Sequence, residues 1–287
     1  MNIEVILVNS FTVKGKGGNP AGVVLNADGL TDAQKLKIAQ AVGYSETAFV
    51  SSDDDADFEV SFFTTTDEVD FCGHATLATF STLYQKGILT AGTYTQRTKV
   101  GILSVTIEPS GKVIMAQQLP QTLACFSYHE ISQVIGIESS VLQSTQLPIE
   151  VISTGLPDVI IPVPHGYLDL IKPNDELIAA FCKKHKVVGF HVFELCSAGS
   201  NLTASCRNFA PLFGISEESA TGSSSGALAC YLTEHLALGS EYIFEQGRAM
   251  GCTSIITASI ESDNATVTSV KVGGFASIIE TVMMPLI

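Results

Sequence analysis

Three side chains that can exchange protons near neutral pH lie in segments rich in small and hydroxyl residues. Glu46 lies in "SETAFV" (45–50), His74 in "CGHAT" (72–76) and Glu218 in "EESATG" (217–222). A half-buried carboxylate can take a proton from carbon, and an imidazole can shuttle that proton or orient the base. Simpler interpretations stay open at this point. Glu46 would be a surface carboxylate near a helix end, His74 a capping imidazole in a turn, and Glu218 an acidic residue in a first helical turn.

The segments around His74 and Glu218 belong to an internal repeat. At an offset of 149 (222 minus 73) or 150 (246 minus 96), six pairs match in order: Gly73 with Gly222, Ala78 with Ala227, Leu83 with Leu232, Gln96 with Gln246, Gly101 with Gly251 and Ser104 with Ser254. Each copy contains an acidic residue, a glycine turn, a helix pattern and strand patterns. The chain therefore reads as two related halves.

The repeated object is a helix that begins at a glycine, Gly73 in one half and Gly222 in the other. Unpaired backbone N–H groups at such a helix start can bind a carboxylate or phosphate, and glycine lets the ligand approach closely. The alternative is that each glycine only permits a tight turn between strand and helix. The two interpretations have equal weight at this point.

Local patterns predict the elements that precede Glu46. Strands are expected over 4–9 and 21–25, and a helix from Thr31 or Asp32 to Val42, with Thr31 and Gln34 forming a capping box and Gly43 ending the helix. An acidic turn and a strand over 58–64 follow.

Composition indicates a globular protein and excludes several partners. Apolar residues make up 46% of the chain and charged residues 15%, and the net charge of -14 repels nucleic acid and anionic membrane surfaces. The start "MNIEVILVNSF" has no basic region or cleavage site, and the seven cysteines are odd in number without close pairs. We expect reduced thiols, a cytoplasmic location, and no membrane or nucleic-acid partner.

Seven ordered blocks carry a resemblance to a known family. They are "GNPAGVV" (18–24), "SETAF" (45–49), "CGHATLA" (72–78), "RNFAP" (207–211), "EESATGSSSG" (217–226), "QGRAMG" (246–251) and "VGGFA" (272–276). Together they resemble the PhzF-like family of phenazine biosynthesis, within the diaminopimelate epimerase superfamily. The resemblance implies an α+β fold of two pseudo-symmetric halves, each a curved mixed β-sheet, barrel-like, around a central helix. It places the active site between halves formed by residues 1–116 with 277–287 and by residues 117–276.

The resemblance also implies roles for individual residues. Glu46 would be the main general acid/base, with His74 and Glu218 assisting it. Residues around the two helix starts would bind the substrate: Asn19, Ser45, Cys72, Gly73, Thr221, Gly222 and Ser223. No metal and no cofactor is expected.

Several positions depart from the family pattern. Glu218 and Ser219 replace the usual Asp and Pro, which changes the reach of the carboxylate and should loosen the turn, and Cys252 stands where an Arg is frequent. In cysteine-dependent epimerases of the superfamily two thiols face the substrate carbon, one from each half. Here Cys72 occupies the position of the first thiol, but Thr221 occupies the position of the second. Cys72 is therefore expected to be a small turn residue rather than a base.

Other clusters are expected to have no catalytic role. "GKGGNPAG" (15–22) lacks the end of a phosphate loop, and Asp53 to Asp57 lack the spacing of a calcium loop. Cys182, His185, His191 and Cys196 do not match a zinc module, and packing is expected.

The sequence thus predicts a cofactor-independent isomerase that shifts a proton on a small carboxylate-bearing metabolite, similar to trans-2,3-dihydro-3-hydroxyanthranilate isomerase. An amino-acid epimerase or racemase, and an inactive metabolite-binding homologue, are the alternatives. A homodimer is possible.

Overall fold

The computed structural model describes residues 2–264 and 266–285, and its chain divides into two compact units. Unit 1 comprises Met1–Ala116 and Gly273–Ile287, and unit 2 comprises Gln117–Val272. The chain returns to unit 1 at Gly273 rather than at the expected residue 277. The backbone of Gly273 already packs against Val113, so closely that an added Cβ would lie 2.7 Å from the Val113 carbonyl oxygen.

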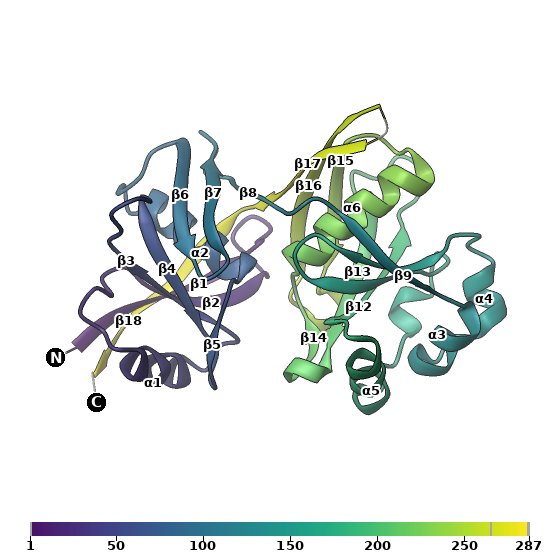
Figure 1. The fold of residues 1–287 in the computed structure, drawn as a ribbon, viewed down its shortest axis with the longest axis horizontal. Coiled ribbons are helices and arrows are strands. Elements are labelled where there is room, and N and C mark those ends of the chain that lie inside the picture. Colours follow the sequence, from purple (N-terminus) through teal and green to yellow (C-terminus); the bar gives the residue numbers. More distant parts are fainter. Residues whose placement is uncertain (1, 265, 286–287) are drawn as a thin grey trace. The chain divides into compact units, whose positions relative to one another are not determined.

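Unit 1 is a mixed sheet with one helix inside it and one outside it (Figure 1). Its strands are β1 (Asn2–Ser10), β2 (Asn19–Val24), β3 (Thr47–Ser51), β4 (Phe58–Phe63), β5 (Glu68–Val69), β6 (Gly92–Thr98), β7 (Gly101–Ile107), β8 (Val113–Ala116) and β18 (Ala276–Pro285), and its helices are α1 (Asp32–Val42) and α2 (Gly73–Gln85). The strands pair in the order β18, β1, β2, β3, β4, β6, β7, β8, with β5 also on β4. The β2–β3 and β4–β6 pairs are parallel and the others antiparallel.

Helix α2 is the centre of unit 1. Every residue from His74 to Leu83 is buried, and the helix contacts β1, β2, β3, β7, β8 and β18. A helix buried on all its faces needs apolar or small side chains all round, and the run "HATLATFSTL" supplies them. Two of its hydroxyls are satisfied within the helix, since Thr79 Oγ1 donates to the Ala75 carbonyl oxygen at 2.8 Å and Thr82 Oγ1 to the Ala78 carbonyl oxygen at 2.7 Å. Ser81 Oγ instead donates to the Ala276 carbonyl oxygen, at 3.4 Å.

Helix α1 lies on the other face of the sheet and confirms the local prediction. Thr31 caps it, the Thr31–Gln34 capping box is formed, and Gly43 ends it at φ 72°. Ile38 and Ala39 of α1 pack with Phe49 and Phe63 in a second apolar cluster. This packing positions the α1–β3 connection, where Glu46 lies.

Unit 2 repeats the pairing scheme of unit 1 in seven strand pairs. Its strands are β9 (Gln121–Phe126), β10 (Ile149–Ser153), β11 (Pro157–Pro162), β12 (Gly189–Leu195), β13 (Ala204–Ala210), β14 (Ile215–Glu218), β15 (Glu241–Gln246), β16 (Ser254–Asp263) and β17 (Thr266–Gly274). The β11–β12 and β13–β15 pairs are parallel, as β2–β3 and β4–β6 are in unit 1. Helix α6 (Gly222–Leu236) is the central helix and contacts β10, β11 and β16.

Outer helices complete unit 2 (Figure 1). They are α3 (Tyr128–Ile135), α4 (Ser139–Gln143), α5 (Asp175–His185) and the short 3-10 turns η1 (Leu168–Leu170), η2 (Pro211–Phe213) and η3 (Arg248–Met250). Ile131, Leu142 and Ile178 of these helices share one core with the strands they cover. Within the described residues, no helix combines the length and apolar character needed to cross a membrane.

Candidate active site

The start of α2 brings Glu46, Cys72 and His74 together. His74 Nε2 lies 3.3 Å from Glu46 Oε2, and His74 Nδ1 lies 3.4 Å from Cys72 Sγ. The imidazole therefore stands between a thiol and a carboxylate. The side chains of His74 and Glu46 are only 5% and 14% exposed, so their contacts are strong relative to contacts in bulk water.

Hydrogen bonds to backbone carbonyl oxygens hold two of these residues, and the backbone conformation positions the third. Cys72 is extended at φ -143° and ends the preceding segment, so that α2 begins at Gly73. Ser10 Oγ donates to the His74 carbonyl oxygen at 2.6 Å, and Gly22 N donates to the Glu46 carbonyl oxygen at 3.1 Å. Strands β1 and β2 thus hold both ends of the cluster.

The geometry of Gly73 bears on the two interpretations left open for the helix start. Its φ is not positive, and an added Cβ would meet only the Phe71 ring, at 4.0 Å. A tight turn therefore does not require glycine here. The geometry favours the other interpretation, in which the missing side chain leaves the first N–H groups of α2 open to an anion.

Burial lowers the pKa of His74 from its usual range, while the charge of Glu46 and a hydrogen bond with the Pro20 backbone oppose this shift. The imidazole is accordingly neutral near neutral pH. A neutral imidazole can accept a proton on one nitrogen and donate from the other. The cluster can therefore relay a proton between its two neighbours.

A second polar cluster precedes α6 in unit 2. Thr221 Oγ1 donates to Glu218 Oε2 at 2.6 Å, and the Gln246 side-chain amide donates to the Glu218 carbonyl oxygen at 2.7 Å and to Thr221 Oγ1 at 3.0 Å. Thr221 N in turn donates to Gln246 Oε1 at 3.1 Å. These bonds tie the turn that was expected to be loose without proline at residue 219, because Gln246 takes over the constraint.

The structure places the remaining predicted residues near one cluster or the other. Asn19 is buried on β2 opposite Ser10, the residue that holds His74, and Ser45 directly precedes Glu46. Gly222 is buried at the start of α6, and the carbonyl oxygen of Ser223 accepts from Thr154 Oγ1 at 3.0 Å. The predicted residues thus form one group in each unit.

Comparisons with known proteins identify the family. A profile of the phenazine biosynthesis-like protein family (PhzC-PhzF) matches residues 8–282. The chain belongs to this family. An uncharacterized isomerase of Clostridium acetobutylicum is 34% identical over 95% of this chain and 94% of its own length. The trans-2,3-dihydro-3-hydroxyanthranilate isomerase of Pseudomonas fluorescens is 28% identical over 94% of each chain.

Solved structures confirm the predicted epimerase-like α+β fold. The PhzF-family phenazine biosynthesis protein of Bacillus anthracis superposes with a TM-score of 0.91 at 31% identity, over 99% of both chains. A hydroxyproline epimerase of Agrobacterium vitis shares the fold at 9% identity, with a TM-score of 0.62 over 99% of this chain and 91% of its own.

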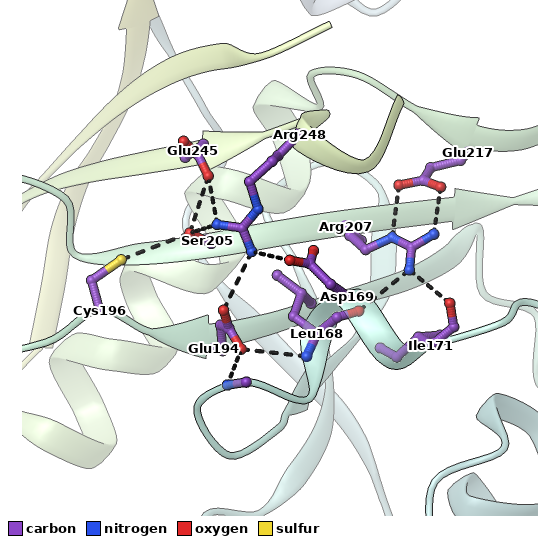
Figure 2. Close-up of polar contacts among 11 residues, drawn as sticks. Leu168, Asp169, Ile171, Glu194, Cys196, Ser205, Arg207, Glu217, Glu245 and Arg248 are labelled. Atoms are coloured by element: carbon purple, nitrogen blue, oxygen red, sulfur yellow. Dashed lines mark hydrogen bonds and ion pairs between the residues drawn. The ribbon is translucent and has the colours of Figure 1, made fainter. Parts of the chain in front are cut away.

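Two arginines of this phenazine biosynthesis-like protein were not predicted from the sequence. Figure 2 shows Arg207 and Arg248 on either side of the segment that contains Leu168 and Asp169. Arg207 makes a two-pronged ion pair with Glu217, at 2.9 and 2.7 Å, and also donates to the Ile171 carbonyl oxygen at 2.8 Å. Because Glu217 adjoins Glu218, Arg207 fixes the strand that carries the candidate acid.

Arg248 does not replace the arginine that is missing at residue 252. Its guanidinium donates to Glu245 Oε1 at 2.9 Å and to Asp169 Oδ2 at 3.0 Å (Figure 2). Cys252 itself is exposed. The family pattern gave the position of this departure, but only the structure shows that Arg248, four residues earlier in the chain, is already paired.

Asp158 is a third residue that the sequence analysis missed. It is 1% exposed at the start of β11, where Ser224 Oγ of α6 donates to its Oδ2 at 2.6 Å. Burial raises the pKa of Asp158 to about 6 against hydrogen bonds from Ser224 and Gly189 that lower it. A lone aspartate in the apolar run "GLPDVIIP" was the available signal.

The cluster of Cys182, His185, His191 and Cys196 is dispersed by the fold. Cys182 is buried in the unit 2 core, His185 packs against Phe126 and Phe181, and His191 Nδ1 lies 3.0 Å from Asn208 Oδ1. All seven cysteines have free thiols. Packing therefore explains this group, as expected.

Proposed function

We propose that this isomerase moves a proton between two positions of a small, carboxylate-bearing metabolite, with Glu46 as the general base. The observation that carries the proposal is the 3.3 Å contact of Glu46 with a buried, neutral His74 at the start of α2. The start of α2 also indicates the kind of substrate, because the first backbone N–H groups of this helix are suited to binding a carboxylate.

The proposed reaction begins when a Glu46 oxygen removes a proton from a carbon next to an electron-withdrawing group. The bonding electrons move into the conjugated system, and negative charge develops on the substrate carboxylate. Backbone N–H groups at Gly73 and His74 stabilise that charge. Glu46 then returns the proton to a different carbon, and the double bond has moved.

His74 keeps Glu46 in position and exchanges a proton with it during the cycle. Glu218, which accepts a hydrogen bond from Thr221 at 2.6 Å, is proposed as the second acid/base, and the N–H groups at Gly222 and Ser223 as further anion-binding groups. Asn19, Ser45, Cys72 and Thr221 are proposed to line the substrate.

Epimerisation is the second candidate, and one observation favours it. Cys72 Sγ lies 3.4 Å from His74 Nδ1, so a thiol stands beside an imidazole that could take its proton. The reaction would then return the proton to the same carbon from the opposite face. Against it, the corresponding place in unit 2 holds Thr221, whose hydroxyl donates to Glu218.

Deuterium incorporation tests the proposal. Candidate carboxylates, including trans-2,3-dihydro-3-hydroxyanthranilate, are incubated with the protein in D2O and analysed by NMR. We expect deuterium at carbon with movement of a double bond, and a loss of about 10²–10⁴-fold in Glu46→Gln. Deuterium with loss of chirality at one carbon would establish the epimerase instead. Thermal stabilisation by a carboxylate without any deuterium would establish a binding protein.

Glu150→Gln is the matched control for this experiment. Glu150 is also a partly buried carboxylate beside an imidazole, with its Oε2 2.8 Å from His235 Nε2. Its loss should leave deuterium incorporation unchanged. An equal loss in both variants would show that the effect of Glu46→Gln is not specific.

The cellular setting is proposed on the sequence and on the thiols. The seven free cysteines support a reducing, cytoplasmic compartment. The net charge of -14 supports a small-molecule partner rather than nucleic acid or a membrane. A homodimer stays a prediction.

A further inference from the structure

We propose that Glu46, Cys72 and His74 also form a binding site for one soft divalent cation such as Zn²⁺, and that the bound ion reversibly inhibits the enzyme. Binding of the ion depends only on these three side chains. Inhibition rests on the proposed function, because the ion would occupy the carboxylate that acts as the base.

The donor atoms are already close together. One oxygen, one sulfur and one nitrogen from the three residues lie within 4.8 Å of one another, and within the described part of the chain this is the one such group. Zinc bonds of about 2.0–2.3 Å at tetrahedral angles separate two ligands by about 3.3–3.8 Å. The 3.3 Å contact of Glu46 Oε2 with His74 Nε2 falls in that range. Cys72 Sγ lies 3.4 Å from the other ring nitrogen, Nδ1, so the thiol would have to turn about its Cα–Cβ bond to share an ion at Nε2.

The backbone holds the donors before any ion arrives. Cys72 and His74 lie on one helical turn, which the bonds from Thr76 N to the Cys72 carbonyl oxygen and from Ser10 Oγ to the His74 carbonyl oxygen keep in place. Glu46 is the longest and most exposed of the three ligands, at 14%, and provides the flexible ligand. A preorganised site loses little conformational entropy on binding.

The ligand types select the kind of ion. One sulfur, one imidazole nitrogen and one carboxylate match zinc or a similar transition ion rather than Mg²⁺ or Ca²⁺, which prefer oxygen. On binding, the S–H bond of Cys72 breaks, a sulfur–metal bond forms and the proton leaves to solvent. Thiolate and carboxylate then balance the two positive charges, which offsets the unfavourable position of a cation at the start of a helix.

Unit 2 contains a group of the same residue types in a different order, and this group provides the control. Glu150 stands in the middle there, with Oε1 3.7 Å from Cys125 Sγ and Oε2 2.8 Å from His235 Nε2. No choice of one ligand atom from each of these three residues brings all three within 4.8 Å of one another, in contrast to Glu46, Cys72 and His74. Cys125→Ser therefore removes a thiol that is more exposed than Cys72 and also lies in a group with a glutamate and a histidine, and it leaves the proposed site intact.

Cobalt substitution tests the binding. Chelator-treated full-length protein is titrated with Co²⁺, whose bonds to thiolate give a charge-transfer absorption in the near ultraviolet. We expect this absorption to saturate at one equivalent, to vanish in Cys72→Ser, to weaken in His74→Gln and to persist in Cys125→Ser. Added Zn²⁺ should abolish it by displacement. Absence of the absorption, or its survival in correctly folded Cys72→Ser, would overturn the site.

Inhibition is tested separately, on deuterium incorporation with any substrate found above. Equimolar Zn²⁺ should stop incorporation, and a chelator should restore it. If cobalt binds but Zn²⁺ does not reduce turnover, the inhibitory role is wrong and the metal-binding site stands. Absence of turnover in the metal-free protein would overturn the proposed function, and the cobalt titration would still decide the site.

Discussion

At the scale of single residues, burial controls the chemistry of this protein more than local sequence does. Glu46 and Asp158 are both carboxylates near the first turn of a central helix, and each meets a polar side chain of that turn: His74 for Glu46 and Ser224 for Asp158. Their environments differ, since Asp158 is only 1% exposed and the side chain that contacts it is a hydroxyl rather than an imidazole. As a result, the Asp158 carboxyl group is costly to ionise.

Asp158→Asn should therefore raise the free energy of unfolding at alkaline pH. The folded pKa of about 6 lies above the ordinary value of 3.8, so the charged group destabilises the protein above pH 6, and this cost disappears as the pH falls toward 3.8. The difference of about two units corresponds to up to about 3 kcal/mol. Urea unfolding at pH 8 and at pH 4.5 measures it.

The expected pattern is a gain in the Asp158→Asn variant at pH 8 that shrinks at pH 4.5. Asp54→Asn, at an exposed position, is the control and should show no gain. An equal effect of Asp158→Asn at both pH values would mean that the carboxyl does not titrate in this range.

At the scale of elements, the turn before α6 is held by β15 and η3. Gly247, between them, has φ +81°, and an added Cβ would lie 2.4 Å from the Cys252 carbonyl oxygen and 2.8 Å from the Ser219 carbonyl oxygen. Its backbone therefore packs directly on the segment that carries Glu218. The repeat in the sequence matched this glycine to no partner, because β15 and β16 are joined by a turn that contains η3, whereas β6 and β7 are joined tightly at Thr98 and Gly101.

Gly247→Ala should consequently destabilise the protein and weaken turnover. We expect a loss of several kcal/mol, since the backbone strain of about 1 kcal/mol is added to a clash with two carbonyl oxygens. Gly251→Ala isolates the strain, because Gly251 has φ +70° with open space around it. Thermal unfolding of the two variants gives the comparison, and similar melting temperatures would contradict the packing argument.

At the scale of the whole molecule, the chain forms unit 1 from both of its ends and unit 2 from one continuous segment. The last strand, β18, pairs with β1 from Asn2–Pro285 to Ser10–Ala276, with one bulge between Leu7 and Val8. It also contacts the central helix α2. Unit 1 is thus closed only by a strand that follows all of unit 2 in the chain.

Deletion of residues 276–287 should therefore unfold unit 1 selectively. Without β18, one edge of β1 and one side of α2 lose their cover, and a buried helix would face water. Hydrogen exchange followed by mass spectrometry should show lost protection in β1 and α2 and retained protection in α6. Equal protection of α2 in the deleted and full-length chains would contradict this dependence.

Much of the fold was predictable because its signals are local or repeated. The Thr31–Gln34 capping box and the Gly43 end of α1 involve bonds within one turn, and the repeat around Gly73 and Gly222 revealed two similar halves. The bonds of Gln246 and the hydrogen bond of Asp158 with Ser224 were not predictable. They join residues far apart in the chain, and no short-range pattern encodes such contacts.

The sequence by itself determined the family, the fold class and the identity of Glu46, His74 and Glu218 as candidate acid/base residues, because residue types in ordered blocks suffice for that. Only the tertiary structure decided that His74 lies between Cys72 and Glu46, and that Gly73 is not required by a turn. Distances, exposure and the space around a backbone arise only when strands and helices pack. Those quantities set the charge of His74 and give Glu46 the partner with which it can act as a base.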